Sequence, residues 1–359
     1  MKVAVMKNSI TKRIIKISFI LGIVLIISLL FSFAVGSVHI SWHEILILIK
    51  NKLTGKPLEG MPDETIIFQI RIPRALLAVL VGASLSVAGV AFQGLLRNPL
   101  ADPYIIGASA GAALGATLAM ILGFKEGFLG IAPVTVMAFA GSIITIFVIY
   151  RLAVVESKIP VETFLLAGVV VGSFIWAVIS FIVSIAGEKL SIIVLWLMGS
   201  LADRSDWIHL AAVFPFFLLG SIILFIYSHK LNILTLGEEQ AAHLGINVER
   251  MKLVIIIAAS LVTSAAVSVS GLIGFVGLMI PHIVRMITGA DHRTLLPASA
   301  LAGGIFLLLA DNLSRSLLPW VSSFSSFSSL GEQEIPVGVI TAIIGAPFFF
   351  YLLYKRRKK

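Results

Sequence analysis

Long apolar runs separated by short polar stretches dominate the sequence. An α-helix rises about 1.5 Å per residue, so about 20 apolar residues cross a hydrocarbon core of about 30 Å. Most of the runs have about this length and carry almost no charge. The pattern therefore predicts ten transmembrane helices, at residues 17–36, 75–96, 103–124, 128–150, 163–186, 208–228, 253–270, 271–287, 295–311 and 336–354.

One division between helices rests on length alone. No charged residue occurs in residues 253–284, and this stretch as one helix would be about 48 Å long, which is too long for a single span without a steep tilt. We therefore expect a turn near Ser270 and Gly271.

A polar interruption at residues 234–246 separates two of the apolar runs. Thr235 and Glu238 have the spacing of a capping box, and Gly245 suits the end of a helix, so a helix of about two turns is expected. Asn247 can cap the following helix. A helix of about 12 Å cannot cross a bilayer, and carboxylates enter hydrocarbon at high cost. The interruption therefore lies at the membrane surface, either as an ordinary loop or as a contact for a partner.

The composition agrees with a membrane protein made of one domain over residues 1–359. Hydrophobic residues make up 58% of the chain and charged residues 13%, whereas soluble domains carry about 25% charged residues. The chain has no cysteine, which excludes disulfides, Cys-ligated zinc and thiol catalysis.

The net charge of +9 is better explained by membrane topology than by nucleic-acid binding. When the ten predicted spans are threaded, 18 Lys and Arg residues fall on the side of the two termini and nine on the other side. Basic residues concentrate in cytoplasmic loops. Both termini and residues 234–246 are therefore expected in the cytoplasm.

Three segments are expected on the outer side of the membrane. Residues 39–53 and 190–198 are apolar yet too short to cross, so they are predicted to lie along the membrane surface as interfacial helices. Residues 322–329 are rich in serine and are expected to form a loop.

Signals for nucleotide and metal chemistry are weak. The glycine-rich phosphate-binding motif that ends in Gly-Lys-Ser or Gly-Lys-Thr is absent from the sequence. His39 and His43 with Glu44 could hold a metal from one helix face, but such a pair is more often structural, so no metal site is predicted.

Acidic residues near the bilayer midplane are a mark of ion-coupled carriers. The predicted spans have none there, because Asp102 and Asp311 stand at span ends. An ion-coupled secondary transporter therefore remains an alternative with little support. A membrane hydrolase comes third, because His282, Asp291 and His292 lack an obvious nucleophile partner.

Three arginines stand at the outer ends of predicted spans: Arg71, Arg74 and Arg315. Long basic side chains often anchor a helix at this depth. The statistics of membrane topology disfavour cations on this side, and guanidinium groups pair bidentately with carboxylates. Docking of an acidic partner is therefore the alternative to anchoring.

Several strings, in this order and spacing, resemble one family. The strings are RIPR (71–74), GASL (82–85), QGLLRNPLADP (93–103), GASAGA (107–112), WLMGS (196–200), LGEE (236–239), LG (244–245), GFVGLMIPH (274–282), PVGV (336–339) and GAP (345–347). They are similar to those of the FecCD-type permeases of bacterial ABC importers for iron-siderophores, haem and vitamin B12. The resemblance covers almost the whole chain.

The resemblance implies an all-α type II importer permease in a bacterial or archaeal cytoplasmic membrane. It implies a homodimer with two cytoplasmic ATPases and an extracytoplasmic substrate-binding protein. ATP and Mg²⁺ would bind the ATPases, so this chain is expected to have no catalytic residue and no cofactor. An iron-siderophore is the first expectation for the substrate, with haem and cobalamin as alternatives.

The resemblance also suggests roles for particular residues. Residues 234–246 are similar to the coupling helices that sit in a cleft of the ATPase, and Arg71, Arg74 and Arg315 to positions that receive acidic residues of the binding protein. Asn98, Pro99 and Asp102 belong to a signature in a cytoplasmic turn, whose role is either gating or turn geometry. The residues expected to couple to the ATPase are Leu236, Gly237, Glu238, Glu239, Ala241, Leu244 and Gly245.

Overall fold

The computed structural model describes residues 2–36, 40–54, 62–124, 127–202, 206–322 and 334–357, and within these ranges the fold is helical apart from two isolated β-bridges. The α-helices are α1 (Lys2–Ala34), α2 (Trp42–Leu53), α3 (Pro62–Thr65), α4 (Ile72–Leu95), α5 (Ala108–Leu122), α6 (Pro133–Ala153), α7 (Val161–Ser184), α8 (Leu190–Leu197), α9 (Trp207–Leu234), α10 (Glu238–His243), α11 (Val248–Ser270), α12 (Val276–Thr288), α13 (His292–Ser322) and α14 (Val337–Arg357). A π-helical turn, Ile66–Arg71, leads into α4, and 3₁₀ turns occur at Pro103–Ile106 and Gly187–Lys189.

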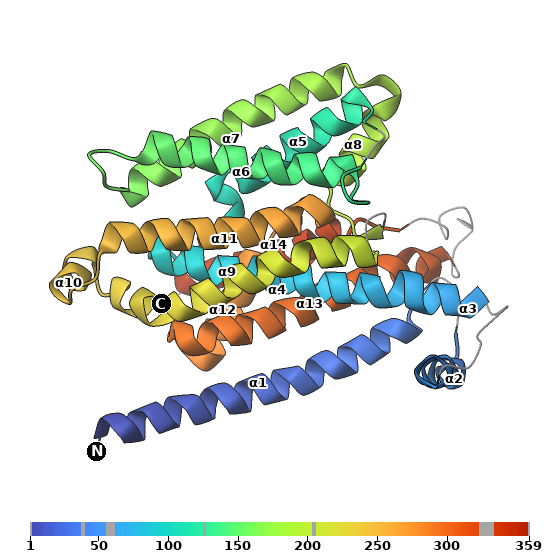
Figure 1. The fold of residues 1–359 in the computed structure, drawn as a ribbon, viewed down its shortest axis with the longest axis horizontal. Helices are drawn as coiled ribbons and strands as arrows, with labels where there is room; N and C mark the ends of the chain where they lie inside the picture. The colour runs from blue at the N-terminus through green and yellow to red at the C-terminus, as the bar shows by residue number, and fades with distance from the viewer. Residues whose placement is uncertain are drawn as a thin grey trace.

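The helices run roughly parallel to one long axis in three groups (Figure 1). The group α5, α6 and α7 forms one edge, α1 forms the opposite edge, and α4, α9, α11, α12, α13 and α14 lie between them. In this central group, α4 and α11 are largely buried, because α13, α9, α11 and α12 surround α4. The apolar side chains of the whole central group form most of the main hydrophobic core.

Close packing depends on residues without bulky side chains. A Cβ atom built on Gly82 of α4 would lie 2.2 Å from the carbonyl oxygen of Gly303 in α13. A Cβ on Gly115 of α5 would lie 2.0 Å from the carbonyl oxygen of Met137 in α6. Small residues at such positions let two helices approach closely.

Eight of the described helices are long and apolar enough to cross a membrane, and two apolar helices are shorter, Ala108–Leu122 and Val276–Thr288. Together they correspond in order to the ten predicted spans. The third and eighth spans, predicted at 103–124 and 271–287, begin too early, because α5 starts at Ala108 and α12 at Val276. Residues 103–106 form a 3₁₀ turn that is followed by Gly107, and residues 271–275 are not helical.

The turn expected between the seventh and eighth spans is confirmed. Helix α11 ends at Ser270, and Gly271 has a φ of 68°. Such an angle is easy for glycine and strained for other residues.

The short surface helices also form. Ser41 and Glu44 make a reciprocal capping box at the start of α2, and Ile45 and Leu48 on the buried face of α2 pack in a small separate core with Ile67. Helix α8 covers the second predicted surface segment. Residues 323–329 of the expected serine-rich loop lie outside the described residues.

Helix α10 and both chain termini lie toward one end of the bundle, which we call the α10 end, while α2 and α3 lie at the other, the α2 end (Figure 1). This arrangement agrees with an even number of crossings. The side of the membrane that each end faces stays a prediction.

Candidate functional site

The α10 end presents a short helix between two long ones. The prediction of a capping box formed by Thr235 and Glu238 is wrong. The hydroxyl of Thr235 donates to the carbonyl of Asn232 at 2.6 Å and completes the last turn of α9. Helix α10 begins at Glu238 after Gly237, whose φ is 128° and which provides no side-chain cap.

The end of the segment agrees with the sequence. Gly245 has a φ of 79°, and the side chain of Asn247 accepts a hydrogen bond from the Arg250 amide at 3.0 Å and caps α11. The predicted turn and cap are therefore confirmed.

The residues expected to couple to an ATPase divide into two sets. Leu236 and Leu244 are 67% and 64% exposed, and Glu239 is also exposed. Ala241 is buried and anchors α10 to the body of the protein. Glu238 points inward to Lys252, with 2.7 Å between Oε2 and Nζ. Helix α10 thus offers an apolar and acidic surface, whereas its first residue is tied to α11.

The turn after α4 is built by Asn98 and Asp102. The side chain of Asn98 accepts from the Leu100 amide at 2.9 Å, and that of Asp102 accepts from the Tyr104 amide at 2.8 Å. Burial raises the pKa of Asp102 to about 6, although its hydrogen bond from the Tyr104 amide acts in the opposite direction. These contacts account for turn geometry, and the gating role of Asn98, Pro99 and Asp102 stays a prediction.

Tyr104 joins this turn to the link between α11 and α12. Its hydroxyl donates to the carbonyl of Ile273 and accepts from the Ile273 amide, both at 2.8 Å. Both backbone groups of Ile273 are therefore satisfied where no helix can satisfy them.

Arg71, Arg74 and Arg315 cluster at the α2 end, but inside the protein. They are only 3%, 5% and 5% exposed. The surface that the sequence suggested is therefore not formed by their side chains in this conformation. Their docking role stays a prediction, because an acidic partner would have to displace groups that already contact them.

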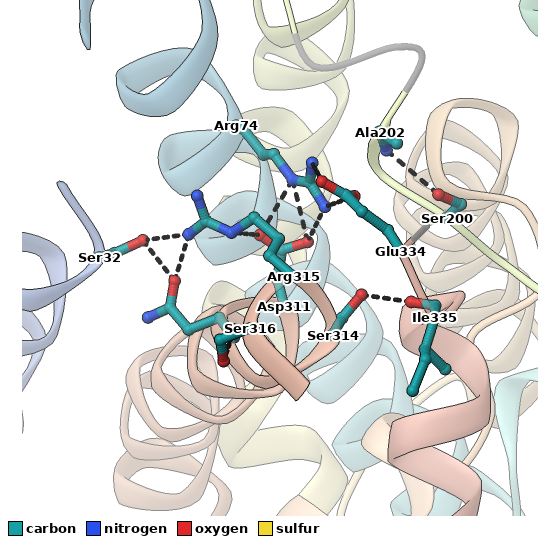
Figure 2. Close-up of polar contacts among 11 residues, drawn as sticks. Ser32, Arg74, Ser200, Ala202, Asp311, Ser314, Arg315, Ser316, Glu334 and Ile335 are labelled. Atoms are coloured by element: carbon teal, nitrogen blue, oxygen red, sulfur yellow. Dashed lines mark hydrogen bonds and ion pairs between the residues drawn. The ribbon is translucent and has the colours of Figure 1, made fainter. Parts of the chain in front are cut away.

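Arg74 lies between two carboxylates (Figure 2). Its Nε is 3.1 Å from both oxygens of Asp311, and its Nη2 is 2.9 Å from Asp311 Oδ1. On the other side, Nη1 and Nη2 donate to Glu334 at 3.1 and 2.7 Å. The Asp311 side chain is fully buried, whereas that of Glu334 is 38% exposed. Glu334 therefore covers Arg74 from the solvent side.

The other two arginines tie α1 to this cluster. Arg315 forms an ion pair with Asp311 at 3.3 Å, donates to Ser32 of α1 at 3.0 Å (Figure 2), and contacts the side-chain oxygen of Asn312. Arg71 donates to the carbonyl of Phe33 at 2.8 Å, at the C-terminus of α1. A cation there also complements the negative end of the helix dipole.

Reasoning from sequence missed three ionic residues. Asp311, which was expected at a span end, lies inside α13, and neither Glu334 nor Lys252 was singled out. The one local signal was the i,i+3 spacing of Glu249 and Lys252, because Asp311 and Glu334 are 237 and 260 residues from Arg74. Within the described residues, no group of three His, Cys, Asp or Glu side chains could hold a metal, and His39 lies outside them.

Comparisons with known proteins agree over nearly the whole chain. The model of the FecCD transport family matches residues 24–355. The cobalamin import system permease protein BtuC of Halobacterium salinarum is 44% identical over 303 residues, which are 84% of this chain and 77% of the relative. The molybdate import system permease protein MolB of Haemophilus influenzae is 36% identical over 345 residues, 96% of each chain.

A solved structure supports the same relationship. It is described as an inward-facing conformation of a metal-chelate type ABC transporter, is 37% identical, and superposes with a TM-score of 0.79 over 95% of this chain and 99% of that chain. Other relatives are named for the transport of hemin and of iron chelatin and for the import of Fe(3+)-citrate. The fold is therefore that of a type II importer permease.

Proposed function

The chain belongs to the FecCD transport family of ABC permeases, and on this premise we propose that it moves an iron-siderophore complex across the cytoplasmic membrane. It is the multi-pass permease of an importer and not itself the ATPase. The observation that carries the choice of substrate is the match to a metal-chelate type transporter over 95% of this chain. Relatives named for iron chelates support it.

Cobalamin is the second candidate, because a relative named for cobalamin import is 44% identical to this chain. Haem follows, on a relative named for hemin transport. All three ligands suit the same machinery. The family assignment replaces the ion-coupled carrier that the sequence alone left open.

The proposed assembly contains a second copy of this chain, two ATPases at the α10 end and a binding protein at the α2 end. The exposed leucines Leu236 and Leu244 support the ATPase contact, since large apolar side chains at a protein surface mark contact sites when they cluster. The excess of basic residues on the side of the termini supports a cytoplasmic position for the α10 end. ATP and Mg²⁺ are assigned to the ATPases.

For docking of the binding protein, Arg74 is the best placed of the three predicted arginines. Its outer partner, Glu334, is partly exposed, whereas the Asp311 contact of Arg74 is fully buried. An acidic side chain of the binding protein can take the place of Glu334 on the same guanidinium edge. Arg71 and Arg315 support this cluster from inside.

The proposed function is tested by reconstituting the permease in lipid with its cognate ATPase. ATP hydrolysis is measured without the binding protein and with binding protein loaded in turn with ferric siderophore, haem or cobalamin. We expect the ferric-siderophore form to stimulate hydrolysis most. Stimulation by cobalamin or haem alone would replace the substrate, and failure to assemble with any ATPase would overturn the function.

A further inference from the structure

Lys252 is a cation buried at the α10 end. It lies in the second turn of α11 and is only 2% exposed. Its ammonium group donates to Glu238 of α10 at 2.7 Å, to Glu249 of α11 at 3.2 Å, and to the carbonyl of Ile159 at 3.0 Å. All three donor positions of the ammonium are thereby used.

Both backbone groups of Ile159 contact the cluster. While the carbonyl of Ile159 accepts from Lys252, its amide donates to Glu249 Oε2 at 2.7 Å. Ile159 stands in the turn between α6 and α7, and α7 begins two residues later at Val161. One ionic cluster therefore holds both the first residue of α10 and the backbone that leads into α7.

The charges of the cluster oppose its separation. Two carboxylates converge on one buried ammonium group, so separating Glu238 from Lys252 would leave the buried charge with fewer partners. Hydrogen bonds between charged groups are short and strong in such surroundings. A shift of α10 is therefore favoured to carry Lys252 and the α6–α7 turn with it rather than to break the contacts.

Helix α7 is able to follow such a shift. It packs on α5, α6 and the 3₁₀ turn Pro103–Ile106, and much of its remaining surface is exposed, including Leu166, Val170 and Phe174. Among the described residues, few contacts to other elements hold it in place.

We propose that Lys252 is a positioning residue that transmits movement of α10 to the start of α7. This inference rests on the proposed function, in which α10 receives the ATPase. The proposal also gives two neighbouring glutamates different roles. Glu239 is exposed toward a partner, whereas Glu238 faces Lys252 and passes the movement inward.

The test uses the complete transporter in proteoliposomes, with ATP hydrolysis and uptake of ferric siderophore measured in the same preparation. We expect Lys252→Met to retain ATPase binding and hydrolysis but to lower uptake per ATP at least 10-fold. Lys252→Arg, which keeps the charge and its donors, should recover much of that ratio. Lys158→Met is the matched control, because Lys158 is exposed in the same turn, and it should behave as wild type.

A purely structural role predicts a different result. It would lower the melting temperature or the yield of Lys252→Met but leave uptake per ATP within twofold of wild type, and that outcome would overturn the inference. If Lys252→Met does not fold, Glu238→Gln tests the same link from the α10 side, where the side chain is 34% exposed. A wild-type permease that fails to assemble with the ATPase would instead refute the proposed function itself.

Discussion

Asp311 is the residue on which the buried cluster at the α2 end depends. It is fully buried and contacts two guanidinium groups, those of Arg74 and Arg315. A buried ion pair adds little stability compared with an apolar replacement, but loss of one partner leaves an uncompensated charge.

Asp311→Asn should destabilise the protein strongly. Two buried arginines would then face a neutral amide, at a cost of about 3–5 kcal/mol in the free energy of unfolding. Thermal unfolding in detergent measures the effect. Glu334→Gln is the control, with an expected cost of about 1 kcal/mol or less because its side chain is partly exposed. Equal losses for both variants would contradict this account of the cluster.

Removal of Glu334 should strengthen docking. Glu334→Ala frees the outer edge of Arg74 for a carboxylate of the binding protein, and we expect the affinity of the loaded binding protein to rise about 10-fold, near the lower end of the range for one hydrogen bond to a charged group. Surface plasmon resonance on nanodisc-embedded permease measures it. Ser316→Ala, on the same helix α13, serves as control. Weaker binding by Glu334→Ala would show that Glu334 itself is part of the contact.

Asp102 should make stability depend on pH. Its pKa is raised to about 6 in the folded protein from an ordinary 3.8, so the folded state binds the proton more tightly and stability falls as pH rises from about 4 to 6. Asp102→Asn should therefore be more stable than wild type at pH 7.5, by about 3 kcal/mol. That advantage should disappear near pH 4. A difference that is the same in melts at both pH values would refute the assignment.

At this scale the sequence located charges but not their partners. It correctly placed Arg71, Arg74 and Arg315 together at one end of the bundle. It could not predict their burial, because the partners of Arg74 are Asp311 of α13 and Glu334 just before α14, which only the packing of the helices brings near. The roles of Gly245 and Asn247 were easier to predict, because each residue acts on its immediate neighbours in the chain.

At the scale of elements, α10 is a helix whose outer surface is exposed and does not pack on the rest of the described protein. Leu236 and Leu244 are exposed on either side of it, while Ala241 holds it to the bundle. Changes to the exposed side chains can therefore alter partner binding without altering the fold.

The double variant Leu236→Ser with Leu244→Ser should lose the ATPase but keep its fold. Burial of two leucines at an interface contributes about 1.5–3 kcal/mol each, so we expect the affinity for the ATPase to fall at least 10-fold. Co-purification and titration of the ATPase in detergent measure this, with the melting temperature as a check on folding. Gln240→Ser, an exposed polar position on α10, is the control. Unchanged affinity would remove α10 from the interface.

Periodicity and length located the elements better than their ends. Runs of apolar residues found each of the ten apolar helices, because burial in lipid or protein selects such runs regardless of partner. Helix α5 was drawn five residues too long at its start, since Pro103 and Gly107 build a separate turn. The prediction for Thr235 was wrong because its hydroxyl can either cap the start of α10 or bond to the end of α9. It bonds to the end of α9.

At the scale of the whole molecule, the order and spacing of short strings carried more information than any physical pattern. Periodicity predicted an all-helical membrane protein with a surface segment. It could not predict that α5, α6 and α7 form a group apart from α4 and α13, because apolar helices offer similar surfaces to one another. The grouping is set by small contacts such as Gly82 with Gly303, which become visible only in the folded chain.

The brevity of α12 has a consequence for how the protein enters the membrane. Its 13 residues would extend only about 20 Å and include Pro281 and Arg285, so the segment is a poor substrate for insertion by the translocon on its own. The five residues that join it to α11 favour entry of the two as a hairpin. Gln93 of α4 accepts a hydrogen bond from Arg285 at 2.8 Å, and α4 is synthesised well before α12. The hydrogen-bond partner of Arg285 is therefore already present when α12 enters the membrane.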